Sequence, residues 1–176
     1  MGNCSYCGQP AGFLRKKHAA CEAKHNEAWS RMVAIATDAA LDKLPFDSLE
    51  AQLNELARSG FIPISRVQEA MIRGWEQGVD HFLGDGHLNE SEEERLSEFR
   101  QKFSLSQDQL DRQGAYSRLV KGLVLRDVMN GVLSERVDVQ GSLPFSLQKT
   151  EKLIWLFPEV KCYEDQKRRH YVSGPG

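Results

Sequence analysis

Three cysteines and a histidine near the start of the chain have the spacing of a zinc site. They are Cys4, Cys7, His18 and Cys21, hereafter the CCHC cluster. Two residues separate the members of each pair, which lets a short turn aim both side chains at one tetrahedral ion. Four protein ligands leave the ion no open coordination position, so it would stabilise structure rather than activate water. We therefore expect a structural zinc finger, which constrains the N-terminal arm more than any other feature.

A second histidine leaves the ligand set open. His25 lies four residues after Cys21 and would give a Cys-x3-His pair on one helix face, although we favour His18.

Three interpretations of the cysteines compete with a metal site. A thioredoxin-type redox pair needs a strand–helix context that this turn-rich arm lacks, and a disulfide needs an oxidising compartment. An N-terminal acylation signal requires Ser or Thr where Tyr6 stands.

Composition supports a cytoplasmic protein. The 176 residues are 40% hydrophobic and 27% charged, which is ordinary for a globular chain. All the cysteines except Cys162 lie in the first 21 residues, and such clustering suits a metal in a reducing cytosol better than a disulfide framework. The strongest apolar run, residues 153–157, is far too short for a membrane helix. We expect no membrane span.

The middle of the chain has the pattern of a helical bundle. Residues 22–43 carry an apolar stripe of helical period, and Gly74 and Gly78 are expected to permit a close neighbouring helix. The tryptophans Trp29, Trp75 and Trp155 are expected in the core. Four capping signatures follow residue 43, each with an acceptor side chain three residues before its partner. They are Asp47 with Glu50, Ser65 with Gln68, Asn89 with Glu92, and Ser106 with Gln109, and each opens an amphipathic segment.

The pattern changes after Gly131. Residues 137–139 alternate in polarity and residues 153–157 form a strand-like apolar run. We therefore expect a mainly α chain in three parts. These are a zinc finger over residues 1–28, a compact helical bundle over 29–134, and a β-rich tail over 135–176.

An acidic loop begins at Asp85 and leads into a run of glutamates. It has the look of the second half of an EF-hand loop, but His81 and Leu83 occupy the places of the first two carboxylates, so we do not expect a high-affinity calcium site. Capping of the following helix explains the loop best. A weak cation site or a surface for a basic partner is the alternative.

The run from Asp85 to Glu93, Asp-Gly-His-Leu-Asn-Glu-Ser-Glu-Glu, is similar to the Asp-Gly-x-Leu-x-x-x-Glu-Glu signature of TerB-like helical domains. The resemblance covers residues 65–131. It implies a small helical bundle linked to tellurite resistance, phage or colicin resistance and bacterial stress. It also implies an acidic, cation-associated face with Asp85, Glu90 and Glu93. Residues 151–165 resemble the opening strands of a bacterial pleckstrin-homology-like β domain.

No catalytic motif is recognisable, since the chain lacks a Gly-x-Ser-x-Gly elbow, a phosphate-binding Gly-rich loop and a His-Glu-x-x-His pair. The leading hypothesis is a non-catalytic, zinc-containing adaptor that binds a protein partner in bacterial stress response or phage defence. A small-molecule substrate is not expected. The alternative is nucleic-acid binding through the finger, which carries a balance of +3 over residues 1–31, five basic residues against two acidic. Phe13 would contact a base, and phosphates would meet Arg15, Lys16, Lys17 and Lys24.

Overall fold

The structure is a computed structural model and describes residues 2–12, 15–85 and 88–132. The chain divides into two units, Met1–Val132 and Leu133–Gly176. The predicted β-rich tail, with Trp155, Cys162 and the pleckstrin-homology-like resemblance, lies outside the described residues. The prediction of a mainly α chain with an N-terminal Cys/His cluster is confirmed.

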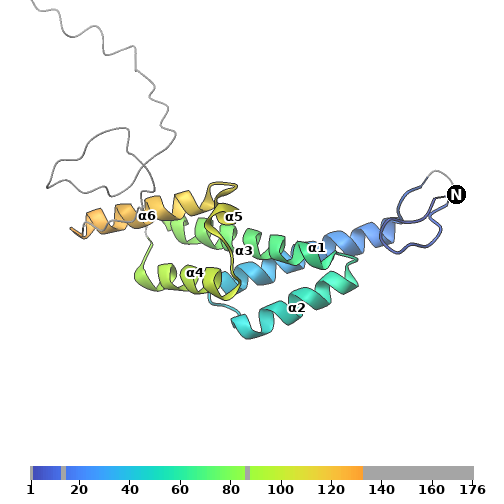
Figure 1. Cartoon of the computed structure of the whole chain (residues 1–176), viewed down its shortest axis with the longest axis horizontal. Coiled ribbons are helices and arrows are strands. Elements are labelled where there is room, and N and C mark those ends of the chain that lie inside the picture. Colours follow the sequence, from blue (N-terminus) through green and yellow to red (C-terminus); the bar gives the residue numbers. More distant parts are fainter. Residues whose placement is uncertain (1, 13–14, 86–87, 133–176) are drawn as a thin grey trace, which may run out of the picture. The chain divides into compact units, whose positions relative to one another are not determined.

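Six α-helices and two short 3-10 turns follow the N-terminal arm within the described ranges (Figure 1). The first helix begins and ends three residues earlier than the predicted 22–43. The helices are α1 (Ala19–Ala40), α2 (Phe46–Ser59), α3 (Val67–Phe82), α4 (Glu90–Lys102), α5 (Gln107–Asp111) and α6 (Ala115–Met129). The 3-10 turns are η1 (Ile64–Arg66), which leads into α3, and η2 (Leu83–Asp85), which follows α3.

Helices α1 and α3 pack with their backbones in close approach. A Cβ atom added at Gly74 would lie 2.4 Å from the Cβ of Ala36 and 2.6 Å from its carbonyl carbon. One turn further, a Cβ at Gly78 would lie 2.9 Å from the Cβ of Ala40. Real Cβ atoms do not approach so closely. The two glycines therefore permit the close neighbour that the sequence predicted.

Trp75 lies at the centre of the core. Its side chain is 1% exposed, and its indole Nε1–H donates to the carbonyl of Leu96 at 3.0 Å. A buried tryptophan usually needs a hydrogen-bond acceptor for its indole N–H, and this bond provides one while the ring stays fully buried. Trp29 is half-buried, with the guanidinium of Arg66 over its ring at 4.3 Å from the centroid. The prediction that these tryptophans lie in the core is thus confirmed for Trp75, whereas Trp29 lies at the edge of the core and is only partly buried.

Two predicted capping boxes are present, that of Asn89 with Glu92 at α4 and that of Ser106 with Gln109 at α5. The other two predictions are wrong, because a proline precedes each of these helices. Pro45 and Pro63, both with ψ near 138°, hold the chain extended up to the point where helical turns begin. Asp47 and Ser65 therefore lie inside the first turns and do not serve as N-caps.

The amphipathic segment predicted after Ser106 consists of two helices. Gly114 adopts φ +73°, a left-handed conformation that glycine tolerates, and it separates α5 from α6. The carboxylate of Asp111 then accepts hydrogen bonds from the backbone N–H of Ser117 at 2.8 Å and from its hydroxyl at 2.9 Å. Asp111 thereby satisfies a free N–H in the first turn of α6.

Candidate metal centre

The N-terminal arm folds back on itself in a tight turn. Asn3 and Pro10 form an antiparallel bridge, and the N–H of Gly8 donates to the carbonyl of Cys4 at 2.9 Å. Gly8 has φ +72°, which a residue with a side chain rarely adopts, so the turn after Cys7 requires glycine. This turn, hereafter the knuckle (residues 2–12), brings Cys4 and Cys7 to one side.

The start of α1 supplies the other two members of the cluster. His18 is the N-cap of α1, and Cys21 lies in its first turn. The knuckle is tied to this end because the N–H of Ser5 donates to the carbonyl of Lys16 at 2.9 Å. As a result, one potential ligand atom from each member of the CCHC cluster lies within 4.8 Å of the other three.

The distances suit a tetrahedral ion. With Zn–N and Zn–S bonds of about 2.1 and 2.3 Å, a nitrogen and a sulfur on one zinc lie about 3.6 Å apart. The Nδ1 atom of His18 is 3.4 Å from the Sγ of Cys7 and 3.7 Å from the Sγ of Cys21. Three thiols and one imidazole are also the donor types that structural zinc prefers. The residues therefore fit a zinc ion.

The hydrogen bond of the histidine ring selects the ligand atom. The Nε2 of His18 lies 3.0 Å from the carbonyl oxygen of Pro10, which can only accept, so Nε2 carries the proton. In the neutral imidazole Nδ1 is then the nitrogen with the free lone pair, and it faces the sulfurs of Cys7 and Cys21. A backbone carbonyl on the distal ring nitrogen is the usual support of a metal-bound histidine.

The sulfur atoms are in conflicting environments. Burial raises the pKa of the Cys4 thiol, but N–H groups of Cys7, His18 and Tyr6 that bond to its sulfur outweigh burial and lower the pKa to about 6. Burial and the adjacent thiols of Cys7 and Cys4 raise the pKa of Cys21 to about 11. The thiol of Cys21 therefore resists ionisation, and a cation among the sulfurs would remove that resistance.

The alternative ligand, His25, is not part of the cluster. Its Nδ1 donates to the carbonyl of Gly60 at 2.9 Å, and its ring lies against Tyr6 with a centroid distance of 4.8 Å. Gly60 is itself close to α1, since a Cβ there would lie 2.3 Å from the Cβ of Ala28. His25 thus joins the knuckle to the end of α2. The spacing of residues gave no signal for this contact, because Gly60 is far away in sequence.

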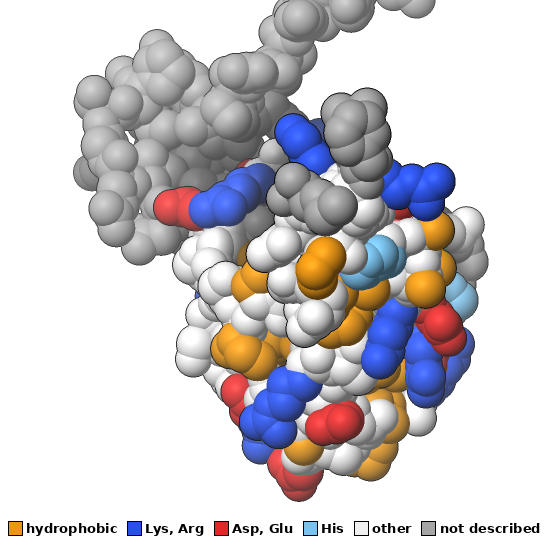
Figure 2. Space-filling view, turned by 90° about the vertical axis from the view of Figure 1, so that its right-hand side faces the viewer, with side chains coloured by type: hydrophobic (Ala, Val, Ile, Leu, Met, Phe, Trp, Pro, Cys, Tyr) orange, Lys and Arg blue, Asp and Glu red, His pale blue; other side chains and the backbone are white. Residues whose placement is uncertain are grey.

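The four basic residues predicted to contact phosphates differ in their surroundings. Lys17 pairs with Glu22, and the ammonium of Lys24 lies over the ring of Phe61 at 5.5 Å. Arg15 and Lys16 are exposed, whereas Phe13 lies outside the described residues. Figure 2 faces the knuckle end, and there the Lys and Arg side chains of the described residues form separate groups with other side chains between them.

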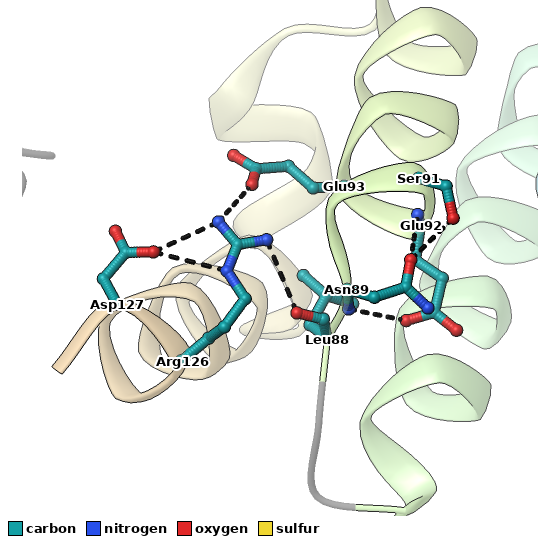
Figure 3. Close-up of polar contacts among 7 residues, drawn as sticks. All are labelled: Leu88, Asn89, Ser91, Glu92, Glu93, Arg126 and Asp127. Atoms are coloured by element: carbon teal, nitrogen blue, oxygen red, sulfur yellow. Dashed lines mark hydrogen bonds and ion pairs between the residues drawn. The ribbon is translucent and has the colours of Figure 1, made fainter. Parts of the chain in front are cut away.

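An arginine of α6 lies beside the start of α4, where the run of glutamates begins (Figure 3). The guanidinium of Arg126 lies 2.7 Å from the carboxylate of Glu93 and 3.1 Å from that of Asp127. Glu90 is exposed, and the side chain of Asp85 lies outside the described part. Of the three residues predicted as weak cation ligands, Glu93 therefore already has a cationic partner within the protein. Among the described residues, only the CCHC cluster brings three or more potential metal ligands together.

No helix within the described ranges is both long enough and apolar enough to span a membrane. Comparisons with family models, with curated proteins and with solved structures found no match. The resemblance to TerB-like domains accordingly stays a prediction.

Proposed function

We propose that the chain is a zinc-binding protein in which a structural ion fixes the knuckle on the N-terminus of α1. One observation carries the proposal. The potential ligand atoms of the CCHC cluster lie within 4.8 Å of one another, and the proton on His18 Nε2 leaves Nδ1 free to bind. A segment as short as the knuckle buries too little apolar surface to be stable alone. Zinc in finger peptides supplies about 10–16 kcal/mol, which is ample.

The coordination set supports a binding role rather than catalysis. Catalytic zinc keeps one position for water or substrate, whereas the CCHC cluster offers four protein ligands. We therefore propose a non-catalytic adaptor that contacts a protein partner. The setting in bacterial stress response or phage defence is proposed from the resemblance of residues 85–93 to TerB-like domains.

Zinc stoichiometry tests the metal. Native mass spectrometry of the full chain should find one zinc, and Cys4→Ser and His18→Asn should each abolish it. His25→Asn is the matched control, because His25 lies beside the site but bonds to Gly60 and should retain the ion. A metal-free chain whose knuckle amides are still protected from hydrogen exchange would refute the proposal.

The binding role needs a separate test. Affinity purification of the tagged wild-type protein from its native host should recover a specific polypeptide bound to it. This expectation holds whether that polypeptide contacts the knuckle or another surface. Failure to retain any polypeptide, together with turnover of a small molecule by the purified chain, would contradict the adaptor proposal while leaving the zinc site intact.

A further inference from the structure

The end of α6 exposes a stripe of large apolar side chains. Leu125, Val128, Met129 and Val132 are 52%, 50%, 63% and 51% exposed. Their spacing of three and four residues places them on one face of the helix. Val132 follows the helix but stays close to it, because Gly131 adopts φ +71° and the N–H of Val132 donates to the carbonyl of Asp127 at 2.8 Å. These four residues are hereafter the α6 stripe.

A groove of about 650 Å³ continues the stripe toward α4. Met129 belongs to both the stripe and the groove, and Leu88, which is 1% exposed, contributes to the apolar lining. The rim is polar and comes from both helices. It consists of Asn89, Glu90, Ser91, Arg126 and Asn130. An apolar surface bordered by polar groups is the usual form of a site for a helical segment of another protein.

The α4 side of the groove is acidic. Glu90 lines the groove, and Glu94 is exposed one turn further along α4. The cation of the rim, Arg126, is already bonded to Glu93 and Asp127, as Figure 3 shows. The end of α4 and the end of α6 that meet here carry opposite ends of the helix dipole, so these dipoles largely offset each other. The exposed glutamates therefore give the α4 side of the groove a negative charge.

We propose that the α6 stripe and the adjoining groove bind a basic amphipathic helix of a partner protein. This inference rests on the binding role proposed above and adds the surface and the chemistry of the partner. Apolar side chains of the partner would cover the stripe and enter the groove beside Met129, and Lys or Arg residues flanking them would face Glu90 and Glu94. Burial supplies the affinity, and the glutamates select the charge and speed the encounter. A second copy of the chain fits less well, because a two-fold contact would bring two acidic rims together.

Two synthetic helical peptides test the charge requirement on the full, zinc-loaded chain. Both carry the same leucine stripe, and the flanking positions are lysine in one and glutamate in the other. Fluorescence anisotropy should show that the lysine peptide binds at least about tenfold more tightly, a difference of about 1.4 kcal/mol. Equal affinity for the two peptides would overturn the proposal.

Matched variants locate the site. Val128→Asp and Glu94→Lys should each weaken binding of the lysine peptide about tenfold or more, because Val128 is an exposed member of the stripe and Glu94 is exposed one turn after the groove residue Glu90. The controls make the same changes elsewhere. Ile64→Asp alters a residue that is 57% exposed before α3, and Glu55→Lys alters an exposed residue of α2. An equal loss in the controls would overturn the proposal.

Two further readouts separate this inference from the proposed function. Sedimentation velocity should show the same mass for wild type and Val128→Asp, and a dimer abolished by Val128→Asp would identify a second copy as the occupant and overturn the proposal. Zinc content and capture of the host partner report on the proposed function independently. Capture that Val128→Asp leaves unchanged would refute this surface while sparing the adaptor role.

Discussion

Replacement of Gly74 by alanine tests the close contact of α1 with α3. The new Cβ would lie 2.4 Å from the Cβ of Ala36, 2.6 Å from its carbonyl carbon and 2.7 Å from the backbone nitrogen of Thr37. Carbon atoms at their optimal separation are about 3.5–4.0 Å apart, so the helices must separate by about 1 Å or more. Two of the three obstructing atoms belong to the backbone, so no rotamer change can relieve the contact.

The net effect is the difference between two opposing terms. Alanine in a helix is favoured over glycine by about 0.8–1.0 kcal/mol. Overpacking of a tight core costs about 1–3 kcal/mol, and sometimes more. A shift of whole helices lies at the upper end of that range, so Gly74→Ala should lower the free energy of unfolding by about 1–2 kcal/mol net. Urea unfolding followed by far-UV circular dichroism would measure the change.

Two variants make this result interpretable. Gly84→Ala is the matched control, because no atom lies within 4 Å of a Cβ placed there, and its effect should stay within about 0.5 kcal/mol. Ala36→Gly should rescue Gly74→Ala only in part, since the backbone contacts remain. A Gly74→Ala protein as stable as wild type, or more stable, would refute the packing of α1 on α3 described above.

Three further perturbations follow from the structure. Arg95 donates to the carbonyls of Ala39 at 2.6 Å and Leu44 at 3.0 Å. Arg95→Met removes both bonds, and within the described part of the chain only the carbonyl of Ala39 keeps a second donor, the N–H of Asp42 at 3.3 Å. The free energy of unfolding measured by urea titration should therefore fall by about 1–3 kcal/mol. Asn89→Ala should remove the capping box and cost about 1 kcal/mol, seen as faster hydrogen exchange in the first turn of α4. Burial raises the pKa of Glu76, so the folded state binds its proton more tightly and stability falls as pH rises through that pKa. Glu76→Gln should therefore be more stable than wild type at pH 7, and urea midpoints of the two should converge below a pH of about 4, where the carboxyl is protonated in both states.

Several features were readable from local sequence because they depend on residues close together in the chain. The CCHC cluster is an example, since each pair of cluster members is held by one turn. The capping boxes of Asn89 and Ser106 are another, because donor and acceptor are three residues apart. Where a proline stood just before the signature, as at Pro45, the helix began earlier and the local pattern misled. The extended conformation of Pro45 placed the start of α2 at Phe46, so Asp47 could not act as the N-cap despite its preference for that position.

Other features depend on contacts between residues distant in sequence, and only the tertiary structure decided them. His25 and His18 have comparable spacing to cysteine, but the carbonyl of Gly60 occupies His25, whereas that of Pro10 orients His18 toward the sulfurs. The resemblance to TerB-like domains implied Glu93 as a possible ligand of a weakly bound cation, and the packing of α6 places the guanidinium of Arg126 beside its carboxylate. Sequence alone determined which side chains could bind a metal and that the chain would be helical, because ligand spacing and periodicity are local. The fold decided which of those side chains are committed to other partners, because a hydrogen bond or ion pair is fixed only when two distant segments meet.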